Sequence, residues 1–201
     1  MNSRERILDG AALVMHERGI GGATTREIAK ASGVSEAMLY KLFPDKTALF
    51  VSVLIERLPP IAVLTAGAEA LPAMNPVVDN IQRLIREVLA FYLQSFPIAV
   101  SVFSDPELLR RHREAVADLG LGPNAISCSI AQYLNLEQRR GRIGSQVAID
   151  AAAETLVGAC LHRAFLTTFA GAGLSSSEVE QFAQATTQVL KPALDLPAAG
   201  D

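Results

Sequence analysis

Apolar residues recur along this chain every three or four positions, which is the spacing of one face of an α-helix. The broadest apolar stripe consists of Val77, Ile81, Leu84, Ile85, Val88, Leu89 and Tyr92. No segment sustains the alternation of apolar and polar residues that is typical of a half-buried strand. The pattern therefore predicts an all-α protein of about nine helices, with four short helices before Pro59 and a larger helical body after it.

Several predicted helices begin at side chains that can cap a helix. These caps are Thr24 with Glu27, Ser35, Asp45, and Ser175 with Glu178. Pro59 and Pro60 stop the fourth helix, because proline cannot continue the backbone hydrogen bonding of a helix. A later helix over about 146–170 is apolar nearly all round, so we expect it to be buried on more than one side.

Composition and charge narrow the class of protein. The chain has 201 residues, half of them hydrophobic, and a mean hydropathy of +0.27, so it can bury a substantial core. Its two cysteines lack the spacing of a disulfide framework or a metal site, and we expect no metal and no cofactor. The absence of a signal-peptide pattern and of any apolar stretch long enough to span a membrane predicts a cytoplasmic protein. The net charge is −3, divided as +1 over residues 1–50 and −4 over the rest.

The second and third helices have the features of a helix-turn-helix. Ala29 is small enough for two helices to cross closely, Gly33 tolerates the positive φ of a sharp turn, and Ile28, Val34 and Leu39 can anchor the third helix. The outer face of that helix then carries Ser35, Glu36, Ala37, Met38, Tyr40 and Lys41. Such a mixture of apolar, hydroxyl and basic groups suits a helix in the major groove of DNA, although short helices joined by glycine turns also occur in plain bundles.

The segment TTREIAKASGVSEAMLYKLFPDKTALF, from Thr24 to Phe50, resembles the DNA-binding signature of the tetracycline-repressor (TetR) family of bacterial transcription regulators. The shared pattern is Thr-x-x-x-Ile-Ala, Gly-Val-Ser, Leu-Tyr-x-x-Phe and Lys-x-x-Leu-Phe, and ILDGAALVMHERG is similar to the family's first helix. The resemblance implies a homodimer that binds a near-palindromic DNA operator, usually represses, and releases DNA when a small ligand enters the C-terminal domain. The corresponding division is a helix-turn-helix domain over 1–46, a ligand-binding and dimerisation domain over 47–192, and a tail over 193–201.

The resemblance also assigns roles to residues of the first domain. By match of position, Thr25, Tyr40 and Lys46 contact phosphates, whereas Ser35, Ala37, Met38 and Lys41 face bases or the nearby backbone. The full predicted DNA-binding set is Thr25, Arg26, Ser35, Glu36, Ala37, Met38, Tyr40, Lys41 and Lys46. Ala37 and Met38 stand where the family commonly has a glycine and a small hydroxyl residue, which leaves the operator sequence open.

Residue types in the helical body suggest a dimer face and a ligand pocket. Small and apolar residues on the last two helices permit close packing of a second copy, and the predicted dimer residues are Leu156, Gly158, Ala159, Cys160, Arg163, Val179, Phe182, Thr186 and Leu190. Aromatic and polar residues of the middle helices can line a pocket for a small, largely apolar effector. They are Phe91, Tyr92, Phe96, Phe103, His112, Cys128, His162, Phe165 and Phe169. Most of these aromatic residues are expected to be plain core.

Two other classes of function are weighed against a DNA-binding regulator. An enzyme is not expected, because Cys160 and His162 point to different faces of one helix and cannot form a nucleophile–base pair. The alternative that stays open is a helical small-molecule or lipid-binding protein without DNA function, in which the N-terminal segment is structural only.

Overall fold

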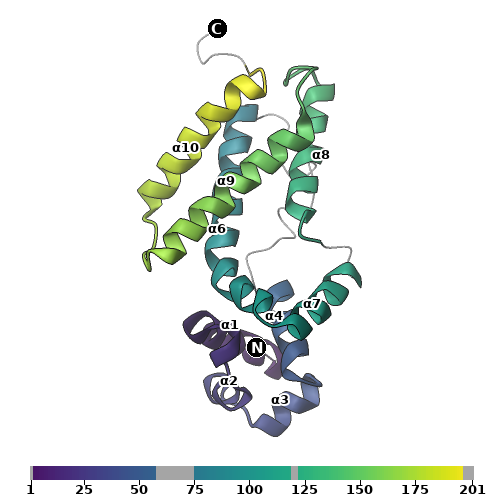
Figure 1. Ribbon diagram of the computed structural model, residues 1–201, viewed down its shortest axis with the longest axis vertical. Helices are drawn as coiled ribbons and strands as arrows, with labels where there is room; N and C mark the ends of the chain where they lie inside the picture. The colour runs from purple at the N-terminus through teal and green to yellow at the C-terminus, as the bar shows by residue number, and fades with distance from the viewer. Residues whose placement is uncertain (1, 58–74, 119–121, 197–201) are drawn as a thin grey trace. The chain divides into compact units, whose positions relative to one another are not determined.

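The computed structural model describes residues 2–57, 75–118 and 122–196 of the chain. In these ranges it contains nine helices and no strand, which confirms the all-α prediction. The helices are α1 (Ser3–Gly22), α2 (Thr25–Ser32), α3 (Glu36–Leu42), α4 (Lys46–Glu56), α6 (Val77–Phe103), α7 (Pro106–Asp118), α8 (Ala125–Arg139), α9 (Ile149–Phe169) and α10 (Ser176–Ala193) (Figure 1). Within the described ranges, no helix is both long and apolar enough to cross a membrane. The predicted stop at Pro59 and Pro60 lies outside the described residues.

The chain packs as two compact units. Unit 1 comprises Met1–Pro60 and Gln94–Gly122, and unit 2 comprises Ile61–Leu93 and Pro123–Asp201. Helix α6 contributes its first part to unit 2 and its last part to unit 1. This grouping differs from the predicted division after residue 46, because α4 packs on α1 and α7 packs on α4. The division into functional domains over 1–46 and 47–192 stays a prediction.

Side-chain caps begin the helices where the sequence predicted them. Thr24 with Glu27 and Ser175 with Glu178 form reciprocal capping boxes at α2 and α10. Asp45 Oδ1 accepts a hydrogen bond of 2.8 Å from the Ala48 backbone N–H, and Ser35 Oγ accepts one of 3.2 Å from Met38. An additional capping box, which was not predicted from the sequence, joins Asn2 and Glu5 at the start of α1. These local bonds set the register at which each helix begins.

The core of unit 1 is shared by the four N-terminal helices, the end of α6 and the start of α7. Its fully buried residues include Ile7 and Leu8 of α1, Ile28 of α2 and Leu39 of α3. Val102 of α6 and Leu108 of α7 lie in the same cluster. A single apolar core therefore joins residues that are about a hundred positions apart in the sequence.

At Gly10, α1 closely approaches Ser32 at the end of α2. A Cβ atom at this position would overlap Ser32 Oγ and would lie 3.0 Å from the Ser32 backbone nitrogen. The Ser32 hydroxyl is itself buried and donates a hydrogen bond of 2.6 Å to the Ile28 carbonyl. Glycine is thus required for the close packing of these two helices rather than for a turn.

The core of unit 2 contains a buried polar cluster between α6 and α8. Asn80 Nδ2 donates a 3.1 Å hydrogen bond to the Tyr133 hydroxyl, and burial raises the pKa of Tyr133 to about 12. One turn later, the completely buried Glu137 carboxylate pairs with Arg140 at 3.0 Å and with Arg142 at 2.5 Å. A carboxylate buried in this way is stabilised only while its cationic partners stay in place. Nothing in the apolar pattern of the sequence indicated that this glutamate is internal.

Helix α9 packs against both α8 and α10, as its apolar character on nearly all sides predicted. One face of it nevertheless stays open: Leu161, Phe165, Leu166 and Phe169 are between 39% and 83% exposed. This strip of apolar side chains is much more exposed than the core of a folded chain allows. It lies on the part of the chain for which the sequence predicted a dimer.

The segment predicted as a tail over 193–201 begins in ordered structure. Leu194 is buried, and its carbonyl accepts a 3.2 Å hydrogen bond from the Gly144 backbone N–H. The end of α10 is thereby attached to the loop between α8 and α9. Residues 197–201 lie outside the described part of the chain.

Candidate nucleic-acid interface

The turn between α2 and α3 is built around Gly33. Its φ of 64° and ψ of 37° are left-handed values that favour glycine. The Gly33 N–H donates to the Lys30 carbonyl at 3.2 Å, and the Val34 N–H donates to the Ala29 carbonyl at 3.0 Å. From α1, the Arg6 Nη2 atom donates a 2.8 Å hydrogen bond to the Gly33 carbonyl. The turn is therefore held both by its own backbone and by a side chain from another helix.

Helix α3 is supported on one side only. Leu39 is its single buried residue, and it belongs to the core of unit 1. The exposed residues of the predicted reading helix are Ser35, Glu36, Ala37, Met38, Tyr40, Lys41 and Leu42. At 100° per residue, Ala37 and Lys41 lie opposite Leu39, so they form the centre of the outer face. A seven-residue helix is too short to be stable alone, and its packing through Leu39 holds it in place.

Hydroxyl groups of α2 and α3 form a small network at one edge of this face. The Thr25 hydroxyl donates a 3.2 Å hydrogen bond to Glu36 Oε2, and the Tyr40 hydroxyl donates one of 3.4 Å to Thr25 Oγ1. Thr25 begins α2, whereas Glu36 and Tyr40 lie four residues apart on α3. Three residues of the predicted DNA-binding set are thus brought together by contacts between two helices.

Lys46 begins α4 beyond the other end of α3. It is half-buried, and its ammonium lies 5.0 Å from the centroid of the Phe50 ring. Burial lowers the pKa of Lys46, and the nearby Asp105 carboxylate opposes that shift. The charge is placed near the first turn of α4, where free backbone N–H groups also favour an anion. Arg26, the remaining predicted cation of α2, is exposed.

The start of α4 is also held by α7. Arg111 Nη2 lies 2.9 Å from Asp45 Oδ2, while the other oxygen of Asp45 caps α4. The hydrogen bond from Ala48 and then the bond from Arg111 lower the pKa of Asp45. Sequence reasoning missed Arg111 because the contact joins residues 66 positions apart. No local pattern in the sequence reports such a pairing.

The predicted dimer residues divide into buried and accessible groups. Leu156, Cys160 and Leu190 are almost completely buried within this chain, and Cys160 Sγ contacts the Ile85 carbonyl at 3.7 Å. These three side chains pack within this chain, and a dimer role for them stays a prediction. The accessible or half-buried members are Gly158, Ala159, Arg163, Val179, Phe182 and Thr186. For these, a dimer role stays a prediction.

Two pairs of the predicted ligand residues lie in contact in the described structure. Phe91 and Tyr92 form an edge-to-face pair with ring centroids 5.2 Å apart, and Phe165 and Phe169 form a second pair at 6.0 Å. Phe96, Phe103 and His112 belong to unit 1, whereas the other six belong to unit 2. The exposed members are Phe103, Cys128, His162, Phe165 and Phe169. Their role in ligand binding stays a prediction.

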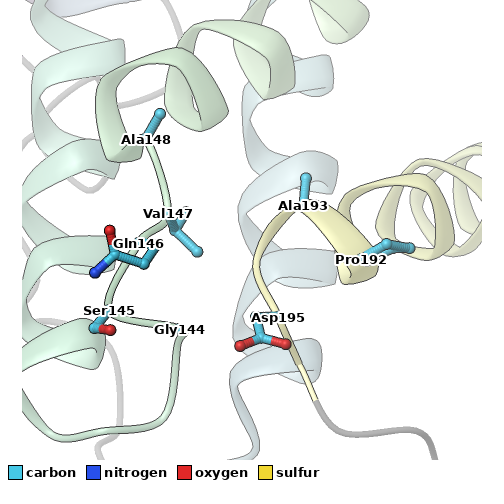
Figure 2. Close-up of a pocket in the computed structure, with 8 residues that line it drawn as sticks. All are labelled: Gly144, Ser145, Gln146, Val147, Ala148, Pro192, Ala193 and Asp195. Carbon is cyan, nitrogen blue, oxygen red and sulfur yellow. The ribbon is translucent and has the colours of Figure 1, made fainter.

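A hollow of about 340 Å³ lies between the α8–α9 loop and the end of α10 (Figure 2). Gly144, Ser145, Gln146, Val147, Ala148, Pro192, Ala193 and Asp195 line it. Figure 2 shows the Asp195 carboxylate on the side of the hollow nearest Gly144 and Ser145. None of the predicted ligand residues lines this hollow. In the described residues, no group of three or more His, Cys, Asp or Glu side chains is placed to hold a metal ion.

Comparison with known proteins places the helix-turn-helix in a family. Residues 7–53 match the family model of bacterial regulatory proteins of the tetR family. The transcriptional repressor AcnR of Corynebacterium efficiens is 40% identical over 53 residues, which are 26% of this chain and 28% of that protein. AcnR of Corynebacterium glutamicum is 30% identical over 82 residues, which are 41% of this chain and 44% of that protein. This chain therefore matches less than half the length of these curated relatives.

Solved structures resemble the chain over nearly its whole length. A TetR-family transcriptional regulator from Mesorhizobium loti has a TM-score of 0.76 at 20% identity, and the match covers 94% of this chain and 95% of that one. The regulator FadR of Bacillus subtilis, solved in complex with stearoyl-CoA, has a TM-score of 0.68 at 16% identity and covers 92% and 96%. At such identities the likeness shows a common fold. This structural likeness includes the helices after residue 53, which the family model does not cover.

Proposed function

Because the chain belongs to the tetR family of bacterial regulatory proteins, we propose that it regulates transcription by binding double-stranded DNA through α3. The observation that carries the proposal is the form of α3. It is a short helix with a single buried residue, Leu39, and its remaining residues are exposed next to the matched turn at Gly33. A regulator of this kind acts on chromosomal DNA, which implies a cytoplasmic protein and no enzymatic reaction.

In this proposal α3 lies in the major groove and its edges contact the backbone. Ala37 and Lys41, at the centre of the outer face, approach base edges, and the thioether of Met38 is available for a thymine methyl group. Thr25, Tyr40 and Lys46 contact phosphates on either side. These contacts leave the fold of unit 1 unchanged, because every one of these side chains except half-buried Thr25 and Lys46 is already exposed.

We further infer that the protein acts as a homodimer on a near-palindromic operator. One seven-residue helix reads few bases, whereas a two-fold dimer presents two such helices about 34–36 Å apart to successive major grooves. The exposed apolar strip of α9, with Val189 of α10 at 75% exposure, supports a dimer through these two helices. Phe169, at 83% exposure, is the most exposed large apolar residue of the strip.

The direction of regulation is proposed to be repression that a small, largely apolar molecule relieves. AcnR of Corynebacterium is a repressor, and FadR of Bacillus subtilis was solved with stearoyl-CoA. In this chain the proposed contact for such a ligand is the aromatic pair of Phe91 and Tyr92 in unit 2. Tyr92 is half-buried, and its neutral hydroxyl can donate a hydrogen bond to such a molecule.

DNA binding is tested by fluorescence anisotropy with fragments of the region upstream of the protein's own coding sequence. We expect specific binding with a Kd on the order of 10 nM or tighter, and a steep loss of affinity between about 50 and 200 mM salt. Binding that ignores salt, or no binding to any fragment, would overturn the proposal. The second outcome, combined with binding of a fatty-acyl compound, would favour the alternative of a lipid-binding protein without DNA function.

A further inference from the structure

The exposed carboxylate of Glu36 occupies an unusual place for a DNA-binding surface. It lies at the start of the proposed reading helix and accepts a hydrogen bond of 3.2 Å from the Thr25 hydroxyl. The Tyr40 hydroxyl donates in turn to Thr25 Oγ1 at 3.4 Å. A hydroxyl group has one proton to donate, so both donors are engaged inside the protein.

Those two hydroxyls are the ones that are proposed to contact phosphates. A phosphate oxygen only accepts hydrogen bonds, so Thr25 must release Glu36, and Tyr40 must release Thr25, before either can bind DNA. The negative charge of Glu36 also repels an approaching phosphate. Glu36 therefore acts against backbone binding both through its hydrogen bond and through its charge.

The position of Glu36 on the helix favours this role over base reading. At 100° per residue, Glu36 lies on the side of α3 that also carries Tyr40, and both contact Thr25 of α2. The centre of the outer face belongs instead to Ala37 and Lys41. Glu36 thus stands at the edge of the helix where the DNA backbone is proposed to pass.

We infer that Glu36 is a positioning residue that restrains non-specific DNA binding, because its carboxylate holds the hydroxyl donors that a phosphate would otherwise take. This inference rests on the proposed function. A specific site has to supply enough base contacts to free Thr25 and Tyr40, whereas random DNA does not. The effect widens the difference in affinity between the operator and the rest of the genome.

A purely structural role for Glu36 makes a different prediction. An acidic residue in the first turn of a helix interacts favourably with the positive end of the helix dipole. If that were its only role, Glu36→Gln would lower thermal stability slightly and leave DNA binding unchanged or weaker. The two roles are therefore separated by the sign of the change in DNA affinity.

The test uses the full-length chain and a labelled 30-base-pair duplex of arbitrary sequence, so no operator needs to be known. We expect Glu36→Gln to tighten this non-specific binding roughly 3- to 10-fold at 0.1 M salt, and to steepen the slope of log K against log salt by up to about 0.9. Glu36→Asp keeps the charge but shortens the side chain. It should tighten binding less than the glutamine variant, with the slope unchanged.

Glu114→Gln is the matched control, because it changes the net charge equally and lies on α7 (Figure 1), which carries none of the residues proposed to contact DNA. It should change the affinity less than about 2-fold, because the Glu114 carboxylate pairs with Arg110 and holds none of the proposed phosphate donors. A third readout is Thr25→Val, which should weaken binding more in a Glu36→Ala background than in the wild type, because alanine offers no acceptor and leaves the Thr25 hydroxyl free to contact phosphate.

Three outcomes overturn the inference: unchanged or weaker binding by Glu36→Gln, an equal effect of Glu114→Gln, or an additive effect of Thr25→Val. Each of them leaves the proposed function intact if the wild-type chain binds DNA with the expected dependence on salt. If the wild-type chain binds no duplex at any salt concentration, the proposed function fails and the inference fails with it. The results therefore show which of the two is wrong.

Discussion

Replacement of Gly33 by alanine tests how the turn of the helix-turn-helix is held. The substitution adds a Cβ atom to a residue with φ of 64°, where an L side chain is strained. The new atom would also lie 2.6 Å from Arg6 Nη2, which donates to the Gly33 carbonyl. Arg6 must then swing away, because the end of its flexible side chain gives way more readily than the backbone.

The expected cost has two parts. The left-handed backbone contributes about 1 kcal/mol, and loss of the Arg6 hydrogen bond contributes about 1 kcal/mol more. The sum is about 2 kcal/mol in the free energy of unfolding. For a chain of 201 residues this corresponds to a fall in Tm of roughly 4–8 °C. Gly171 offers a reference, because its φ is also 64° and a Cβ atom there would meet no neighbour within 4 Å, so Gly171→Ala should cost only about 1 kcal/mol.

The measurement is urea unfolding followed by circular dichroism, for Gly33→Ala, Arg6→Ala and the double variant. If the second part of the cost comes from Arg6, the effect of Gly33→Ala should fall to about 1 kcal/mol in the Arg6→Ala background. An unchanged effect in that background would refute the role of Arg6. A Gly33→Ala variant as stable as the wild type would refute the argument from the left-handed backbone as well.

Three other predictions concern DNA contact, assembly and pH. Lys46→Ala should weaken binding to specific and non-specific DNA about equally and reduce the slope of log K against log salt by about 0.9. Met38→Ala should alter the sequence preference and leave that slope unchanged. Anisotropy titrations against a library of duplexes measure both effects. In sedimentation velocity, Phe169→Glu should convert the proposed dimer into monomers. Phe103→Glu is the control, because Phe103 is 73% exposed but belongs to unit 1, and it should leave the dimer intact. Because the pKa of Asp45 is lower in the folded protein than its ordinary value of 3.8, its ionised carboxylate stabilises the fold at pH values above 3.8. This stabilisation is lost as the pH falls through the pKa of the folded state. The difference in unfolding free energy between wild type and Asp45→Asn should therefore shrink from pH 5 to pH 3, and a constant difference would contradict the assignment.

Local signals in the sequence predicted much of the fold correctly. The pairs Thr24–Glu27 and Ser175–Glu178 form the capping boxes that their spacing indicated, because such bonds depend only on residues three positions apart. Gly33 has the left-handed backbone that the turn required. Leu39 is buried whereas Met38 and Tyr40 are exposed, as the period of the helix predicted.

Contacts between distant residues could not be predicted in the same way. The ion pair of Arg111 with Asp45 and the burial of Glu137 depend on how the helices are packed, which no pattern of nearby residues encodes. Leu156 and Cys160, which the sequence predicted at a dimer face, are buried within this chain, because small and apolar residues suit a core as well as an interface. A single sequence does not distinguish between these two uses of an apolar side chain.

The shared core of unit 1 limits how the protein can be cut and recombined. The family match ends at residue 53, but Val102 and Leu108 complete the apolar cluster around the reading helices. A chimera that joins residues 1–57 to a foreign body would leave this cluster open to water and Asp45 without its arginine. The transplantable module is discontinuous in the sequence, so an engineered sensor should carry residues 94–118 together with the N-terminal helices, or rebuild their contacts in its new host.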